Sequence, residues 1–170
     1  MIMTDKIYLA SWLMPCFEEK TSATEFFRAF AVGKEIARAE LCVSALGVYE
    51  ARINGEKISW PLAPGWTAYQ HRVQYQKYDI TEYLKAENTL SVTVAQGWRM
   101  PYGFEGVTPV RAWGTPEISG DEYALIASLQ IVYADGSEEL LLPDERSAAL
   151  RAAAQNIRTA VVLSAGRHHH

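Results

Sequence analysis

Tryptophan and tyrosine side chains set among glycines and prolines are the groups in this chain best suited to contact a ligand. An indole or phenol ring packs against the apolar C–H face of a sugar, while polar groups at the rim bind its hydroxyls. Neighbouring glycines let the backbone approach closely beside such rings. The sequence therefore predicts carbohydrate contacts by the aromatic residues of the Pro64-Gly65 corner and of the Gly/Pro-rich stretch 97–120, namely Trp66, Trp98, Tyr102 and Trp113.

The same four rings have structural alternatives. Trp66 and Trp98 are expected to close the ends of a β-sandwich if they are buried, which would remove most support for a sugar platform. Tyr102 and Trp113 are equally suited to contact a neighbouring domain. The aromatic pattern alone leaves ligand binding and structural packing open.

Hydrolytic chemistry has weaker support in the sequence. Glycoside hydrolysis needs two carboxyl groups placed on either side of the scissile bond. Acidic residues gather around the Gly/Pro-rich stretch, at Glu105, Glu117, Asp121 and Glu122. Loop acids usually serve as solvated or capping groups, so we expect no catalytic residue. A serine nucleophile has no G-x-S-x-G motif and only His71 as a base, because His168, His169 and His170 resemble a purification tag.

Metal ligands are sparse as well, and the sequence predicts no cofactor. Calcium is the alternative, because it binds six to eight oxygen atoms and two acidic groups offer them. These groups are Asp79, Glu82, Glu87 and Asn88, and the pair Asp121 and Glu122. Asp79 has a competing use as a helix cap. Cys16 and Cys42 are too few and too far apart for a disulfide framework or a zinc site, so we expect reduced, buried thiols.

Composition bounds the class of protein. The chain has 170 residues, 49% of them apolar and 21% charged, with a net charge of −4. These values indicate one folded domain with a tail and give no electrostatic footprint for nucleic acid. Apolar runs fall short of the roughly 20 residues of a membrane span, and the start of the chain lacks the pattern of a signal peptide. We expect a cytoplasmic protein without a membrane or nucleic-acid partner.

Strand patterns and turn signals dominate the chain from Glu25 to Leu142. Asn54-Gly55 and Asp135-Gly136 are turn signals, because these residues tolerate the positive φ of a type I′ hairpin. Asp79 is expected to cap one short helical turn. The expected strands are the segment around 26–32 and the segments 41–45, 48–53, 73–78, 90–94, 124–133 and 138–142. Together they predict an all-β, jelly-roll-like antiparallel β-sandwich over residues 1–145.

Residues 146–167 differ from the rest in being rich in alanine and arginine. Helix-forming residues extend to about Gln155 and precede a β-like patch at Ala160 to Leu163. We expect either a C-terminal helix lying across the sandwich or a cloning or frameshift artefact. Residues 168–170 are set apart as a tag remnant.

Several motifs resemble, in order and spacing, the N-terminal β-sandwich domain of bacterial α-L-rhamnosidases of glycoside hydrolase family 78. They are Phe27-Arg28-Ala29-Phe30, Ala45 to Glu50, Ile53-Asn54-Gly55, Leu62 to Tyr69, Tyr75 to Thr81, Asn88, Gly97-Trp98 and Asp135-Gly136-Ser137. The resemblance covers about Trp12 to Glu145. It departs from the family pattern at Arg99-Met100-Pro101 and from Arg146 onward.

The resemblance implies a non-catalytic accessory domain. Family 78 enzymes are inverting glycosidases whose catalytic carboxylates lie in a separate (α/α)₆ barrel, which would be the partner of this domain within the parent chain. Related sandwiches are carbohydrate-binding modules that hold rhamnose with calcium, so rhamnosyl glycans are the implied ligand. The alternative is a purely structural, interdomain-packing module without a ligand.

Overall fold

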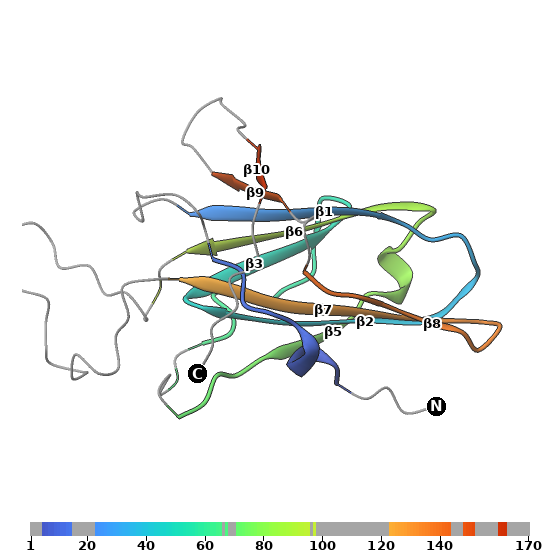
Figure 1. Cartoon of the computed structure of the whole chain (residues 1–170), viewed down its shortest axis with the longest axis horizontal. Helices are drawn as coiled ribbons and strands as arrows, with labels where there is room; N and C mark the ends of the chain where they lie inside the picture. The colour runs from blue at the N-terminus through green and yellow to red at the C-terminus, as the bar shows by residue number, and fades with distance from the viewer. Residues whose placement is uncertain are drawn as a thin grey trace, which may run out of the picture.

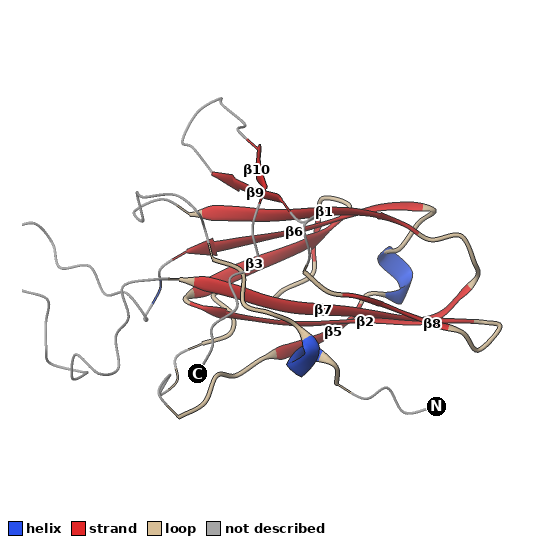
Figure 2. Cartoon of the chain, viewed as in Figure 1, coloured by secondary structure: helices blue, strands red, loops and turns tan. Residues whose placement is uncertain are grey.

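The computed structural model describes residues 5–14, 23–65, 67, 71–95, 97, 123–143, 148–151 and 160–162 (Figure 1). The regular elements of these residues are β-strands (Figure 2), apart from two 3₁₀ turns, η1 (Ile7–Leu9) and η2 (Thr81–Tyr83). Among the described residues, no helix is long and apolar enough to cross a membrane.

The strands form two antiparallel sheets that stack as two layers (Figure 1). One sheet has six strands in the order β10-β9-β1-β6-β3-β4, and the other has four in the order β5-β2-β7-β8. The strands are β1 (Thr24–Ala31), β2 (Ile36–Leu46), β3 (Val48–Ile53), β4 (Glu56–Lys57), β5 (Gln76–Asp79), β6 (Glu87–Ala95), β7 (Ala124–Tyr133), β8 (Glu138–Leu141), β9 (Ala148–Arg151) and β10 (Ala160–Val162). The predicted antiparallel β-sandwich is confirmed.

The core lies between the two sheets because the strands alternate apolar and polar residues. In β2, Leu41 and Val43 are fully buried in the core, whereas Glu40 and Cys42 lie on the opposite face of the strand. Val92 of β6 packs in the same core from the six-stranded sheet. The outer face of β2 is therefore the polar face of the four-stranded sheet.

Glycine and asparagine set the turns that were predicted. Asn54 and Gly55 have φ values of 52° and 83°, which confirms the hairpin turn between β3 and β4. Gly47, with φ of 136°, does not join a hairpin, because β2 and β3 belong to different sheets. Only glycine adopts such a φ readily, so Gly47 is where the chain crosses from one layer to the other.

The predicted helical turn after Asp79 is confirmed as η2, although the capping geometry differs from a capping box. The Asp79 carboxylate accepts hydrogen bonds from the backbone N–H of Thr81 at 3.0 Å and from the Thr81 hydroxyl at 2.6 Å. These bonds form an Asx turn and lower the pKa of Asp79. η2 also joins the two layers. The Ala39 N–H of β2 donates to the Thr81 hydroxyl, and the Asn54 side chain donates to the Tyr83 carbonyl.

The expectation of a C-terminal helix is wrong for the part of the tail that the structure describes. Residues 148–151 and 160–162 form strands β9 and β10, and β9 pairs antiparallel with β1, with Phe26 opposite Ala149. The edge of β1 not bonded to β6 offers a row of backbone donors and acceptors. Pairing with that edge outweighs the helix propensity of the alanines.

Candidate functional site

The four aromatic residues predicted to contact sugar, Trp66, Trp98, Tyr102 and Trp113, lie outside the described residues, and their role stays a prediction. The same holds for the acids considered for hydrolysis, Glu105, Glu117, Asp121 and Glu122. Candidate sites in the described part of the chain are therefore built from other side chains.

The corner that precedes Trp66 is tied to the core by buried polar contacts. The Tyr49 N–H donates to the Ala63 carbonyl at 2.7 Å, and the Gln76 side chain donates to the Pro64 carbonyl at 3.2 Å. The Tyr49 hydroxyl donates to the Gln76 amide oxygen at 2.9 Å and lies 3.0 Å from the Tyr78 hydroxyl. Burial raises the pKa of Tyr49, and its contact with Tyr78 adds to this shift. These contacts make the described part of the corner a structural joint.

Two asparagines from the matching motifs also have structural roles. Asn88 is 3% exposed. Its amide oxygen accepts from the Lys85 N–H at 2.7 Å and from the Asn54 side chain at 3.0 Å, and its amide nitrogen donates to the Lys85 carbonyl at 2.7 Å. The Asn54 oxygen in turn accepts from the Thr89 N–H at 2.9 Å. The pair fastens the β3–β4 turn to the start of β6, which leaves the Asn88 oxygen occupied rather than free for calcium.

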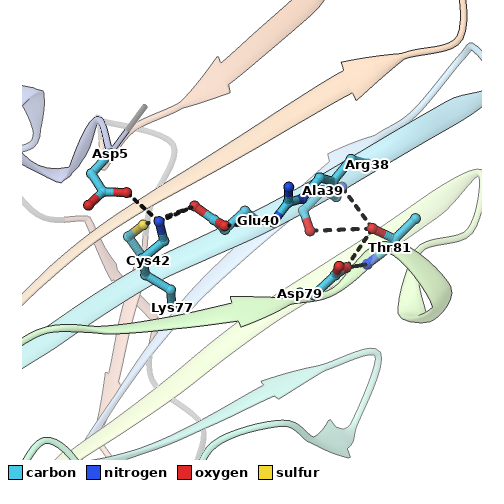
Figure 3. Close-up of polar contacts among 8 residues, drawn as sticks. All are labelled: Asp5, Arg38, Ala39, Glu40, Cys42, Lys77, Asp79 and Thr81. Carbon is cyan, nitrogen blue, oxygen red and sulfur yellow. Dashed lines mark hydrogen bonds and ion pairs between the residues drawn. The ribbon is translucent and has the colours of Figure 1, made fainter. Parts of the chain in front are cut away.

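A cluster of charged groups and a thiol lies on the polar face of β2 and β5 (Figure 3). The Lys77 ammonium lies 2.5 Å from an Asp5 oxygen and 3.3 Å from a Glu40 oxygen. The Cys42 sulfur lies 3.8 Å from the same Glu40 carboxylate. Arg38 adds a second cation, 3.3 Å from the other Glu40 oxygen. Glu40 is almost fully buried, so this pairing offsets the cost of removing its charge from water.

Asp5, Glu40 and Cys42 place one ligand atom each within 4.8 Å of one another, the spacing that a metal ion would need. Their electrostatics favour a different role. The Lys77 ammonium already pairs with the Asp5 and Glu40 carboxylates, and burial, with the Glu40 charge, raises the pKa of the Cys42 thiol to about 11. The hydrogen bond to Asp5 raises the pKa of Lys77, so its ammonium group supplies the cation. The cluster is a network of ion pairs that links the N-terminal segment to the four-stranded sheet.

The predicted calcium ligands Asp79, Glu82 and Glu87 do not form a comparable group, and Asp121 and Glu122 lie outside the described residues. Among the acids, cysteines and histidines that the structure describes, those spaced for a metal are Asp5, Glu40 and Cys42, and Asp79, Glu82 and Glu87 are not among them. The expectation that Cys42 is unpaired and buried is confirmed. Cys16 lies outside the described residues.

Trp60, like Tyr8, is more than 70% exposed in the described part of the chain, and no motif of the sequence singled it out. Trp60 is 72% exposed and Leu62 is 70% exposed, on the loop that follows β4. The available signal was the dipeptide Trp60-Pro61, because proline in an apolar run argues against a strand. Isolated exposed apolar residues are common, but two on one short loop form a patch.

A hollow of about 250 Å³ lies beside this loop, on the outer face of the six-stranded sheet. Its apolar lining comes mainly from Val48, Pro61, Leu62 and Ala95. Glu50 and Lys57 stand at its charged side, where the Glu50 oxygens contact Lys57 at 2.6 Å and Arg52 at 2.5 Å. The hydrogen bonds from Lys57 and Arg52 hold the pKa of Glu50 below its ordinary value. We call Trp60, Pro61, Leu62 and this hollow the Trp60 patch.

The architecture places the chain among the two-layer β-sandwich proteins. The two-layer β-sandwich is shared with a lectin from Pleurotus ostreatus solved in complex with GalNAc, with a TM-score of 0.60 over 86% of this chain and 36% of the lectin. At 16% identity, that likeness shows the fold alone.

Residues 34–158 match the family described as "Alpha-L-rhamnosidase N-terminal domain", and the chain belongs to this family. An α-L-rhamnosidase from Streptomyces avermitilis is 43% identical over 119 residues, which are 68% of this chain and 11% of that protein. One from Formosa agariphila is 31% identical over 121 residues, which are 69% of this chain and 12% of that protein.

Solved structures agree with this assignment. The crystal structure of native α-L-rhamnosidase from Aspergillus terreus is 30% identical, with a TM-score of 0.73 over 88% of this chain and 17% of that one. The Streptomyces avermitilis enzyme complexed with L-rhamnose is 36% identical, with a TM-score of 0.65 over 75% of this chain and 12% of that one. The chain thus spans between a tenth and a fifth of the length of these relatives.

Proposed function

We propose that this chain is a non-catalytic accessory domain of an α-L-rhamnosidase, supporting a catalytic domain that lies elsewhere in the parent chain. The observation that carries the proposal is the match to an N-terminal domain family over residues 34–158, within relatives of which this chain spans 11% and 12%. The (α/α)₆ catalytic domain implied by the resemblance is the partner that we infer.

The electrostatics of four described carboxylates are consistent with a non-catalytic role. A general acid in glycoside hydrolysis needs a raised pKa so that it holds its proton near neutral pH. In this chain the pKa values of Asp5, Glu50, Asp79 and Asp135 are all lowered by hydrogen bonds from lysine, arginine, serine, threonine or tyrosine. These groups are suited to ion pairing and turn formation rather than to proton donation.

The proposal is tested by assaying the purified chain and its full-length parent on an aryl α-L-rhamnoside. We expect the parent to hydrolyse the substrate and the isolated chain to release no aryl alcohol above the rate of a heat-denatured sample. Hydrolysis that co-elutes with the folded chain on gel filtration would overturn the non-catalytic assignment. An inactive parent would overturn its assignment as an α-L-rhamnosidase.

Binding of rhamnosyl glycans by Trp66, Trp98, Tyr102 and Trp113 is the second candidate function. It is favoured by the implied relationship to carbohydrate-binding modules and by the Gly/Pro-rich context of these rings. Isothermal titration of the isolated chain with L-rhamnose, with and without calcium, distinguishes it from a purely structural role. Absence of a heat signal at millimolar sugar in both titrations would reject sugar binding and favour the purely structural role.

A further inference from the structure

The loop that carries Trp60 is anchored by hydrogen bonds at both ends. On one side, the Ile58 N–H donates to the Ala51 carbonyl at 3.0 Å, and the Ala51 N–H donates to the Ser59 hydroxyl at 2.9 Å. On the other side, Ala63 is buried and bonded to Tyr49. Ser59 is also buried. The three residues between these anchors therefore stay outside the sandwich core.

The backbone conformation of Leu62 is unfavourable, and contacts within this chain do little to compensate for it. Its φ is 55°, a left-handed conformation that disfavours residues with a side chain. Its side chain is 70% exposed, so little apolar burial offsets this conformation. A strained backbone that presents an apolar side chain to solvent is typical of a position selected for binding.

The hollow beside the loop suits an apolar side chain of a protein better than a sugar. Its lining is mostly apolar, and both oxygens of the Glu50 carboxylate are already bonded, to Lys57 and Arg52. Sugar hydroxyls need unengaged polar partners, whereas protein interfaces combine an apolar centre containing aromatic anchors with a charged rim.

We propose that the Trp60 patch is a docking surface for another domain of the parent α-L-rhamnosidase chain. This inference rests on the proposed function. A neighbouring domain is the inferred occupant because most of the length of the relatives lies outside the matched region; this chain covers 12% of the Streptomyces avermitilis structure. Trp60 and Leu62 then serve as anchors buried by the neighbouring domain, and the hollow receives one of its apolar side chains.

Hydroxyl-radical footprinting read by mass spectrometry tests the proposal on the isolated chain and on the full-length parent. Tyr8 is a matched internal control, because it is 71% exposed and lies in η1, next to Lys6, which pairs with Glu138 of the four-stranded sheet. We expect Trp60 oxidation, normalised to Tyr8, to be several-fold slower in the parent, because Trp60 is 72% exposed in the isolated chain and anchor residues at interfaces are almost fully desolvated. Equal normalised rates in the two proteins would overturn the proposal.

Variants provide a second readout. Trp60→Ala and Leu62→Ala should leave the unfolding midpoint of the isolated chain unchanged or higher, and should lower the thermal midpoint of the parent. Tyr8→Ala should leave the parent unchanged. A parent insensitive to both patch variants would contradict the docking role.

Other occupants give different outcomes. Protection of Trp60 that grows with the concentration of the isolated chain, together with dimers in sedimentation velocity, would replace the neighbouring domain by a second copy. Protection of the isolated chain by millimolar L-rhamnose would replace it by a sugar. If the parent were inactive but Trp60 were protected in it, the assignment as an α-L-rhamnosidase would fail while the docking surface would stand. Failure of the proposed function is therefore distinguishable from failure of the docking proposal.

Discussion

Replacing Asn88 by alanine should destabilise the fold strongly, because this side chain bonds two segments at once. Asn88→Ala removes the acceptor for Lys85 and Asn54 and the donor to the Lys85 carbonyl. At about 0.5–1.5 kcal/mol for each net hydrogen bond, the loss comes to about 2–4 kcal/mol. That is a large share of the roughly 5–15 kcal/mol by which domains are stable.

The measurement is equilibrium urea unfolding followed by tryptophan fluorescence. With an m-value of about 2 kcal/mol per molar urea, the midpoint should fall by roughly 1–2 M. Ser91→Ala is the matched control, because Ser91 lies on the same strand, facing away from the core, and should change stability by less than about 0.5 kcal/mol. The double variant with Asn54→Gly should show coupling of about 0.5–1.5 kcal/mol. A loss no larger than that of Ser91→Ala, or strict additivity with Asn54→Gly, would refute the network.

Three further predictions concern the Trp60 patch and the charged cluster. Leu62→Gly should raise the unfolding free energy of the isolated chain by about 0.5–1 kcal/mol in urea, since glycine relieves the left-handed φ; a loss of stability would contradict the strain. Lys77→Met should return the pKa of Asp5 toward its ordinary value of 3.8 in an NMR titration. Because Lys77 lowers that pKa in the folded state, the contribution of Asp5 to stability is present above the unfolded value and is lost as pH falls through the folded value. The unfolding free energy of the variant should therefore fall less than that of the wild type as the pH is lowered. An unchanged Asp5 titration would argue against the ion pair. In a Cys16→Ser background, the Cys42 thiol, with a pKa of about 11, should react with a maleimide at pH 8 only on unfolding, because about a thousandth of it is thiolate; rapid labelling of Cys42 in the native chain would contradict its burial.

Much of the fold followed from local patterns. The Asn54-Gly55 turn and the alternation of Leu41 and Val43 with Glu40 and Cys42 were predictable, because turn chemistry and the period of two act over a few residues. The partner of each strand was not predictable in this way. Gly47 illustrates the limit, since a glycine between the expected strands 41–45 and 48–53 is compatible with a turn but does not show that the chain crosses to the other sheet.

The tail was predicted least well. Residues 148–151 have helix-forming composition, yet they pair with β1. Strand pairing depends on an edge more than 100 residues away in the sequence, which local propensity does not include.

The charged cluster also depends on strand pairing that local sequence patterns do not show. Cys42 lies opposite Lys77 only because β2 and β5 pair in one register, and Asp5 joins them from the N-terminal segment. Trp60 was overlooked for a different reason, since composition does not distinguish an apolar residue in the core from one held outside it by anchored neighbours.

The pairing of β9 with β1 has a consequence for where the domain can be divided. A chain cut after residue 145 would lose β9 and leave one side of β1 with unsatisfied backbone donors and acceptors. Such an edge is a template for strand addition by another molecule. Strands β9 and β10 therefore cover this edge of β1, and any truncated version of this domain should keep both of them.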